Sequence, residues 1–184
     1  PNIGNKILSK LSFSKKKRII SLISTINLDR LKKLTKNKNI VRVTPLPPIE
    51  IKKGPIVIYP PNKFVKNLFK HLGEVVEIKN EELSNKFWAT ASIMAAYYEI
   101  LNVSANWLIK KGIKKNIANK YISELFLSLS QDAVNKKSQG FKKLVADSQT
   151  AKGLNMQVLK ELKRGKFYTK FLKAMDNINK RVSS

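Results

Sequence analysis

The sequence predicts an α/β layer followed by an all-helical region, and three observations support this prediction. Short apolar runs alternate with amphipathic segments up to Ile78, which is the pattern of strands and helices in a mostly parallel sheet. After that point the chain contains no further strand-like run. The stretch from Glu81 to Lys110 has neither proline nor glycine and repeats apolar residues every three or four positions, so it predicts one long helix.

Four short strands are predicted in the first part of the chain, at residues 18–24, 40–44, 54–59 and 75–78. Proline clusters end the second and third of these runs, because proline cannot donate a hydrogen bond to a strand ladder. Three helices are predicted around the strands: a short amphipathic helix near the N-terminus, a helix through Leu28, Leu31 and Leu34 capped by Asn27 or Asp29, and a helix over 62–72 closed by Gly73.

The second part of the chain predicts helices only. The long helix ends at Lys110-Lys111-Gly112, where cations suit the negative end of the helix and glycine suits the cap. A helix over 116–135 and a polar connection at 136–140 follow. The next helix passes through Leu154 to Gly165 with Ser148 or Thr150 as its N-cap, and the last spans 167–182. We therefore expect two domains, residues 1–79 and residues 80–184.

Composition excludes several classes of chemistry. The 184 residues contain no cysteine and one histidine, so disulfides, thiol catalysis, cysteine-ligated metal and a multi-histidine metal site are excluded. His71 lies near a predicted helix end, where a surface or capping role is favoured over a catalytic one. No apolar run approaches the length of a membrane span and no signal peptide is evident. A soluble, cytoplasmic protein is expected.

The net charge of +25 is the feature that would favour nucleic-acid binding. Almost all of the positive charge is lysine, spread along the chain, whereas arginine is the residue expected for bidentate recognition of bases and phosphates. A solvated basic surface is therefore the favoured interpretation, and a nucleic-acid partner is the weaker alternative.

The predicted long helix has more aromatic residues than one helix can bury against its own domain. They are Phe87, Trp88, Tyr97, Tyr98 and Trp107. A helix that is apolar around much of its girth is usually buried between partners. We therefore expect the region from Glu81 to the C-terminus to form a homodimer or a higher homo-oligomer.

Several short motifs occur in a defined order along the chain. They are Pro1, the strand end Ile20-Ser21-Leu22-Ile23-Ser24-Thr25, Arg42-Val43-Thr44-Pro45-Leu46-Pro47-Pro48, Gly73-Glu74 with Glu81, Ala95-Ala96-Tyr97, Lys111-Gly112-Ile113, and the stretch from Val145 to Leu154. In this order they resemble pyrroline-5-carboxylate reductase, the NAD(P)H-dependent enzyme of proline biosynthesis, from the middle of its Rossmann domain to its C-terminus.

The resemblance implies a fold and an activity. It implies a partial Rossmann-type layer that binds NADPH or NADH, and a C-terminal helical domain that dimerises. It also implies transfer of a hydride to the C=N carbon of a cyclic imine carboxylate, which gives proline. The cofactor supplies that hydride, so no Ser-His-Asp or paired-carboxylate machinery is needed, and the sequence displays none.

The resemblance also implies roles for particular residues. Glu81 and Thr150 correspond to residues at the catalytic site, and Gln149 and Thr150 to the turn that receives the substrate carboxylate. A helix N-terminus favours an anion, which suits this turn. The ordinary interpretations are that Thr150 is only an N-cap and that Glu81 is only a first-turn acid. The positions that correspond to cofactor contacts are Pro1, Leu22, Ile23 and Ser24.

The chain departs from the family pattern in four places. It contains no glycine-rich phosphate loop, Ser92-Ile93-Met94-Ala95 replaces Gly-Ser-Gly-Pro, Leu46 replaces an amide side chain, and the Gly-Gly of the substrate turn is lost. We expect an N-terminally incomplete chain of a divergent reductase. The alternative is a non-catalytic structural or regulatory homologue that uses the helical domain to oligomerise.

Overall fold

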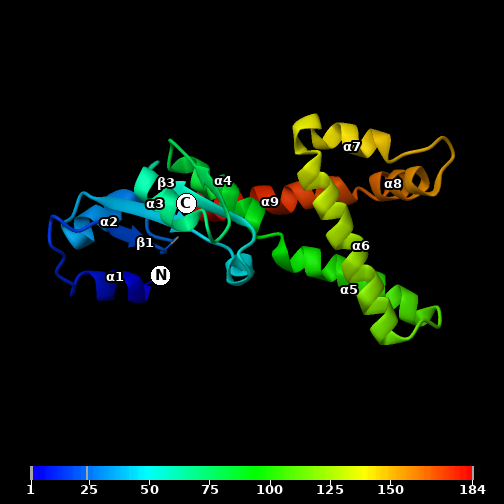
Figure 1. The fold of residues 1–184 in the computed structure, drawn as a ribbon, viewed down its shortest axis with the longest axis horizontal. Coiled ribbons are helices and arrows are strands. Elements are labelled where there is room, and N and C mark those ends of the chain that lie inside the picture. Colours follow the sequence, from blue (N-terminus) through cyan, green and yellow to red (C-terminus); the bar gives the residue numbers. More distant parts are fainter. Residues whose placement is uncertain (1, 24, 184) are drawn as a thin grey trace. The chain divides into compact units, whose positions relative to one another are not determined.

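The computed structural model describes residues 2–23 and 25–183, and the side chains from Ile3 onward in those ranges. The chain forms two compact units, which are described separately below (Figure 1). Unit one comprises Pro1–Ala91 with Asp176–Ser184, and unit two comprises Ser92–Met175. Within the described residues, no helix combines the length and the apolar content that crossing a membrane requires.

The sheet of unit one has four strands in the spatial order β1-β2-β3-β4. They are β1 (Ile19–Ser21), β2 (Ile40–Thr44), β3 (Pro55–Tyr59) and β4 (Glu74–Glu77). The pairs β1–β2 and β3–β4 are parallel, and β2–β3 is antiparallel. All four predicted strands are therefore present, in a mixed sheet in which two of the three pairings are parallel.

Two apolar clusters stabilise unit one. The first joins the sheet to α3 (Lys63–Phe69) through Val41, Val43, Ile56, Ile58 and Val65. The second joins β2 to α2 (Leu28–Thr35) through Ile26, Leu28, Leu31 and Ile40. Successive side chains of a strand point to opposite faces, so Arg42 lies on the same face as Ile40. This is the face that contacts α2.

Asparagine side chains cap the N-termini of two helices. Gly73 lies close against the backbone of Gly54. Asn27 Oδ1 accepts from the Arg30 amide at 2.8 Å, so the predicted cap of α2 is confirmed. Asn62 Oδ1 accepts from the Val65 amide at 3.1 Å and caps α3. A Cβ at Gly73 would lie 2.5 Å from the carbonyl oxygen of Gly54, so the approach of these two segments requires glycine. This unit also contains α1 (Asn2–Leu8) and the 3₁₀ helix η1 (Pro47–Ile51).

The prediction of one uninterrupted helix from Glu81 to Lys110 is wrong. The structure has α4 (Glu82–Ala91) and α5 (Met94–Lys110), which are separated by a turn at Ser92 and Ile93. The interruption lies where unit one ends and unit two begins. Because the two residues are neither glycine nor proline, the local sequence gives no signal for it. Packing of each helix within its own unit overrides the helix propensity of the stretch.

Unit two is helical, as predicted. Helix α6 (Lys115–Asn135) follows α5 after Gly112, which has a positive φ of 93°. The two helices pack through the buried residues Ala105, Ala118 and Ile122, and the rings of Tyr97 and Phe126 meet edge to face at 6.0 Å. The predicted end of α5 at Lys110-Lys111-Gly112 is confirmed, with Lys111 as the C-cap.

The connection after α6 contains more helix than the sequence predicts. A short 3₁₀ helix, η2 (Lys137–Gln139), leads into α7 (Phe141–Asp147), which the sequence analysis does not predict. Helix α8 (Leu154–Arg164) follows and ends at Gly165, as expected. The last helix is α9 (Phe167–Ser183). None of the described residues of α7, α8 and α9 is buried.

Candidate functional site

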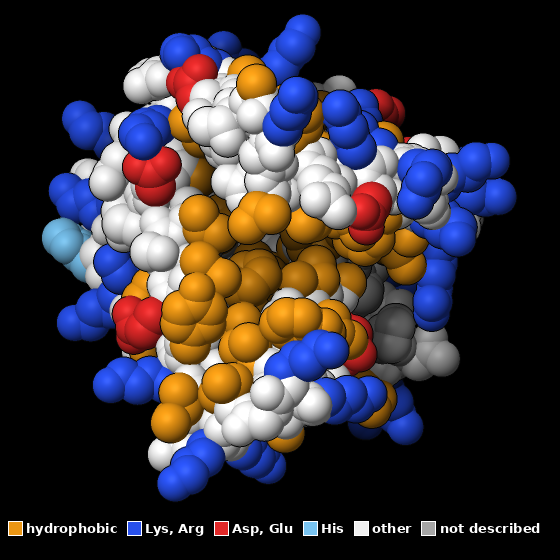
Figure 2. All heavy atoms as spheres, turned by 90° about the vertical axis from the view of Figure 1, so that its right-hand side faces the viewer, with side chains coloured by type: hydrophobic (Ala, Val, Ile, Leu, Met, Phe, Trp, Pro, Cys, Tyr) orange, Lys and Arg blue, Asp and Glu red, His pale blue; other side chains and the backbone are white. Residues whose placement is uncertain are grey.

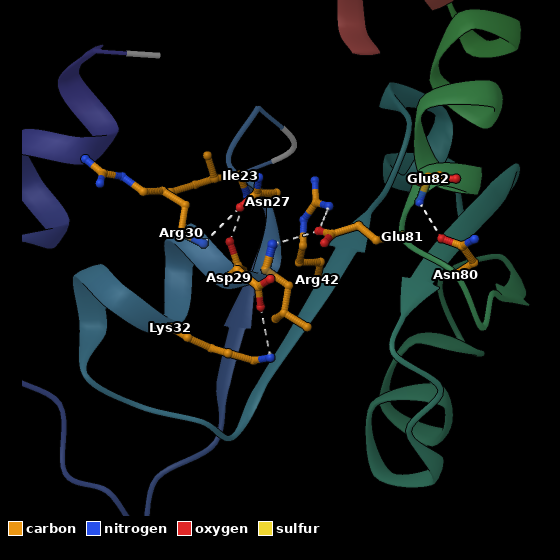
Figure 3. Close-up of polar contacts among 11 residues, drawn as sticks. Ile23, Asn27, Asp29, Arg30, Lys32, Arg42, Asn80, Glu81 and Glu82 are labelled. Atoms are coloured by element: carbon orange, nitrogen blue, oxygen red, sulfur yellow. Dashed lines mark hydrogen bonds and ion pairs between the residues drawn. The ribbon is translucent and has the colours of Figure 1, made fainter. Parts of the chain in front are cut away.

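Glu81 lies immediately before α4, and its carboxylate joins three segments of unit one (Figure 3). Oε1 accepts a hydrogen bond from the Leu28 amide at 2.7 Å. The same oxygen forms an ion pair with Nη1 of Arg42 on β2. The Arg42 side chain is 8% exposed and that of Glu81 is 25% exposed. Glu81 therefore makes two charge-assisted contacts that are largely removed from water.

Two side chains accept hydrogen bonds from backbone N–H groups at the N-terminus of α2. Asn27 Oδ1 accepts from the Arg30 amide, and Glu81 Oε1 accepts from the Leu28 amide. A carboxylate at this position is favourable because the first-turn N–H groups and the helix dipole present partial positive charge. Asp29 adds a further carboxylate in the first turn and pairs with Lys32 at 3.3 Å. This helix start is an internal anion site, and Glu81 is its anion.

The predicted cofactor contacts Leu22 and Ile23 follow β1 at the edge where the parallel strands β1 and β2 end. Ligands of open α/β sheets bind at this edge. The Leu22 side chain is 57% exposed. Ile23 is half-buried against the cluster that includes Leu28, and its amide donates to Ser21 Oγ at 3.3 Å. The other two predicted contacts, Pro1 and Ser24, lie outside the described residues.

The start of α4 is held by local hydrogen bonds. Asn80 Oδ1 accepts from the Glu82 amide at 2.9 Å, and the Glu81 carbonyl accepts from the Ser84 amide at 2.8 Å. Figure 3 displays Asn80 and Glu82 on the side of Glu81 away from Arg42. These contacts orient the backbone at Glu81 so that its side chain extends toward α2 and β2.

The predicted substrate turn, with Gln149 and Thr150, lies in unit two between α7 and α8. Gln149 Nε2 donates to the Val145 carbonyl at 2.6 Å, and the Thr150 carbonyl accepts from the Gly153 amide at 2.9 Å. Asn155 Nδ2 closes the turn by donating to the Ser148 carbonyl at 2.9 Å. The structure therefore places both residues in one tight, hydrogen-bonded turn, in which Thr150 is exposed.

The prediction that Ser148 or Thr150 is the N-cap of the following helix is wrong. Helix α8 begins at Leu154, and its N-cap is Gly153, which provides no side-chain acceptor. The intervening residues form a turn in which Lys152 has a positive φ of 60°. A Cβ at Gly153 would clash with Thr150 Oγ1, so the hydroxyl lies directly against the helix N-terminus without capping it. Hydroxyl residues are favoured caps, but here Gly153 lies between them and the first turn of the helix.

Arg42 contacts Glu81 at this site, and no role is predicted for it from the sequence. The signal was present: Arg42 is the one charged residue of the strand Ile40–Thr44, whose other residues are apolar apart from the final threonine. A charged side chain in a buried strand requires a partner. That partner is 39 residues away in sequence, so spacing alone could not identify it. In the described part of the chain, no group of three or more His, Asp or Glu residues is placed to hold a metal ion.

Comparison with known proteins agrees with this architecture. The family model described as pyrroline-5-carboxylate reductase dimerisation matches residues 81–184. No curated protein sequence matches the chain. Among solved structures, the Plasmodium falciparum pyrroline carboxylate reductase with NADP bound has a TM-score of 0.83 and 20% identity, and the match covers 99% of this chain and 72% of that one.

Two bacterial structures are similar to the same extent. The 1-pyrroline-5-carboxylate reductase of Streptococcus pyogenes has a TM-score of 0.84 and 22% identity, over 99% of this chain and 72% of that one. The enzyme of Coxiella burnetii has a TM-score of 0.79 and 22% identity, over 97% and 68%. At these identities the structural matches establish the fold, and the family model covers more than half of the chain. The chain therefore belongs to the pyrroline-5-carboxylate reductase family, with residues 81–184 as its dimerisation domain.

Proposed function

We propose that this protein is an NAD(P)H-dependent reductase that converts a cyclic imine carboxylate of the 1-pyrroline-5-carboxylate type to proline. The observation that supports the proposal is agreement along the chain: the fold matches an NADP-bound pyrroline carboxylate reductase over 99% of this sequence, and the family model covers residues 81–184. Bound NAD(P)H would supply the hydride that adds to the imine carbon. The imine nitrogen takes a proton, so C=N becomes CH–NH.

The residues at the edge after β1 fit one end of such a cofactor. Leu22 is exposed there and Ile23 is half-buried, which suits contact with a flat, partly apolar ring. The amides of Leu28 and Arg30 at the start of α2 already have acceptors in Glu81 and Asn27. The cofactor pyrophosphate would therefore not be bound at this helix.

The start of α8 fits the carboxylate of the substrate. Its N-cap Gly153 provides no side-chain acceptor, so a small anion would complete the hydrogen bonding of the first-turn amides. Thr150 lies against this helix start with an exposed hydroxyl that would add a further donor. In this proposal Thr150 and Gln149 position the substrate, and Glu81 has the catalytic role that the family resemblance implies.

We also propose that the protein acts as a homodimer or higher homo-oligomer through residues 80–184. The match to a dimerisation model supports this, as does the exposure of apolar side chains on α5, α6 and α8, which include Tyr98, Trp107, Tyr121, Leu154 and Val158. Figure 2 displays hydrophobic side chains gathered in the middle of one face, with lysine and arginine around them. Exposed apolar patches of this kind mark interaction surfaces.

The test of the proposed function is steady-state reduction of 1-pyrroline-5-carboxylate by the complete gene product, with NADPH and NADH. Thr150→Ala is expected to raise the Michaelis constant for the imine by about tenfold, the equivalent of one charge-assisted hydrogen bond. Thr169→Ala, an exposed threonine of α9, is the matched control and should leave both kinetic constants unchanged. A folded wild-type protein with no turnover would contradict the reductase assignment and favour a non-catalytic homologue.

A further inference from the structure

Arg42 is buried in β2, and its ion pair with the partly buried Glu81 links β2 to the segment before α4. We infer that the two residues act as a positioning pair, which holds the loop after β1 and the start of α2 against the start of α4. The inference rests on the proposed function, because the loop contains the expected cofactor contacts Leu22 and Ile23. In this view Arg42 is a positioning residue for cofactor binding.

The Arg42 side chain is stable inside the strand only when a carboxylate pairs with it. Arg42 is in the interior of β2, between Val41 and Val43, and its side chain is 8% exposed. A buried guanidinium without a carboxylate is strongly unfavourable, since desolvation is no longer offset by charge attraction. Glu81 supplies that carboxylate from a segment 39 residues away. Because Arg42 is buried when β2 forms, the fold favours a position of Glu81 in which its carboxylate contacts the guanidinium.

Glu81 in turn fixes the far end of the loop. The loop runs from the end of β1 at Ser21 to the start of α2 at Leu28. At its near end Ser21 pairs with Arg42 in the sheet, and Ser21 Oγ accepts from the Ile23 amide. At its far end the Leu28 amide donates to the same Glu81 oxygen that Arg42 contacts. The near end of the loop is therefore linked to Arg42 by strand pairing, and the far end is linked to Arg42 through Glu81.

This arrangement predicts that replacing Arg42 changes the Michaelis constant for NAD(P)H much more than it changes turnover. If Arg42 only positions the loop, its replacement loosens the cofactor contacts and raises the Michaelis constant for NAD(P)H, while turnover at saturation changes little. A residue that acts directly in the transition state would instead lower turnover. Arg42→Lys retains the charge but loses the planar fork, so its effect should be intermediate between wild type and Arg42→Met.

Amide hydrogen exchange on the complete gene product tests the positioning itself, without any need for activity. The variants are Arg42→Met, Arg42→Lys and Glu81→Gln, and the matched control is Glu77→Gln, which removes the carboxylate of the Lys66–Glu77 pair in the same unit. Exchange in residues 22–30 is expected to be faster by about tenfold or more in Arg42→Met and Glu81→Gln, from the loss of a charge-assisted bond. Glu77→Gln should leave that segment unchanged.

Steady-state kinetics on the same variants tests the consequence. We expect the Michaelis constant for NAD(P)H to rise by about tenfold in Arg42→Met with turnover within about threefold of wild type, and a smaller rise in Arg42→Lys. Unchanged exchange in residues 22–30 of all three variants would overturn the positioning pair. So would an active enzyme in which Arg42→Met alters turnover alone.

The two proposals fail in different ways. A folded wild type that does not reduce the imine contradicts the proposed function, whereas the exchange rates still decide whether Arg42 and Glu81 hold the loop. If Arg42→Met does not fold, Arg42→Lys and Glu81→Gln provide the same comparison against Glu77→Gln.

Discussion

Arg42 lies in a strand of mostly apolar residues, and a charged side chain buried in such a strand needs a partner of opposite charge. Glu81 is that partner, and the fold of the sheet and the start of α4 bring it to Arg42. The Glu81 position was predicted from the family resemblance, and its contacts with Leu28 and Arg42 come from the structure. The spacing of apolar residues in the sequence predicts which side of a helix or strand is buried. The partners in an ion pair depend on the tertiary structure.

A second ion pair makes the stability of unit one depend on pH. Lys66 Nζ donates to Glu77 Oε2 at 2.8 Å, and the Asn62 amide donates to Oε1 at 3.1 Å. The Lys66 hydrogen bond is the main cause that holds the pKa of the Glu77 carboxyl below its ordinary value of 4.5, while partial burial acts in the opposite direction. Because the folded pKa is lowered, ionised Glu77 stabilises the fold above the unfolded pKa, and this contribution is lost as pH falls through the folded value.

The prediction concerns the difference in unfolding free energy between wild type and Glu77→Gln. We expect the difference to be largest near neutral pH and to shrink as the pH falls below about 4.5, measured by urea unfolding at a series of pH values. In a Lys66→Met background most of this pH dependence should disappear. A difference that stays constant, or that grows on acidification, would refute the assignment.

At the scale of elements, the strands and most helices were predictable, because their apolar periodicity agrees with the faces that pack. The interruption at Ser92 and Ile93 was not, since neither residue breaks a helix and only the division between the two units explains it. Helix α7 was missed because it is a single short helix of seven residues with no buried position. Such helices form through their neighbours rather than through propensity.

The turn before α8 allows a test of the site at this scale. A Cβ at Gly153 would meet both the hydroxyl and, at 3.0 Å, the carbonyl oxygen of Thr150. Gly153→Ala is therefore expected to lower the unfolding free energy by about 1–3 kcal/mol, the usual cost of overpacking. Adding Thr150→Ala removes the hydroxyl, so the double variant should recover part of the loss. Strict additivity of the two changes in denaturant unfolding would argue against this turn geometry.

At the scale of the whole molecule, the exposed apolar faces of unit two suggest a partner, and the proposed one is a second copy of the chain. Helix α8 places Leu154, Val158 and Leu162 along one side, with exposures of 81%, 58% and 38%. We expect Val158→Lys to weaken self-association by about tenfold or more, since a charge would be buried at the contact. Light scattering over a concentration series measures the effect.

The control for this prediction is Ile7→Lys on α1, which changes a residue of similar exposure, 52%, in unit one. It should leave the association constant unchanged. A wild-type protein that remains a folded monomer at micromolar concentration would contradict the proposed assembly, and an equal effect of both variants would contradict its location on α8.

The proposed chemistry is tested most directly by following the transferred atom. The complete gene product is incubated with 1-pyrroline-5-carboxylate and NADPH or NADH that carries deuterium at both C4 positions of the nicotinamide, and the product is analysed by NMR. The account predicts proline with deuterium at the former imine carbon, formed in proportion to enzyme and absent without it. Folded, assembled protein that yields no deuterated proline with either cofactor would contradict the account.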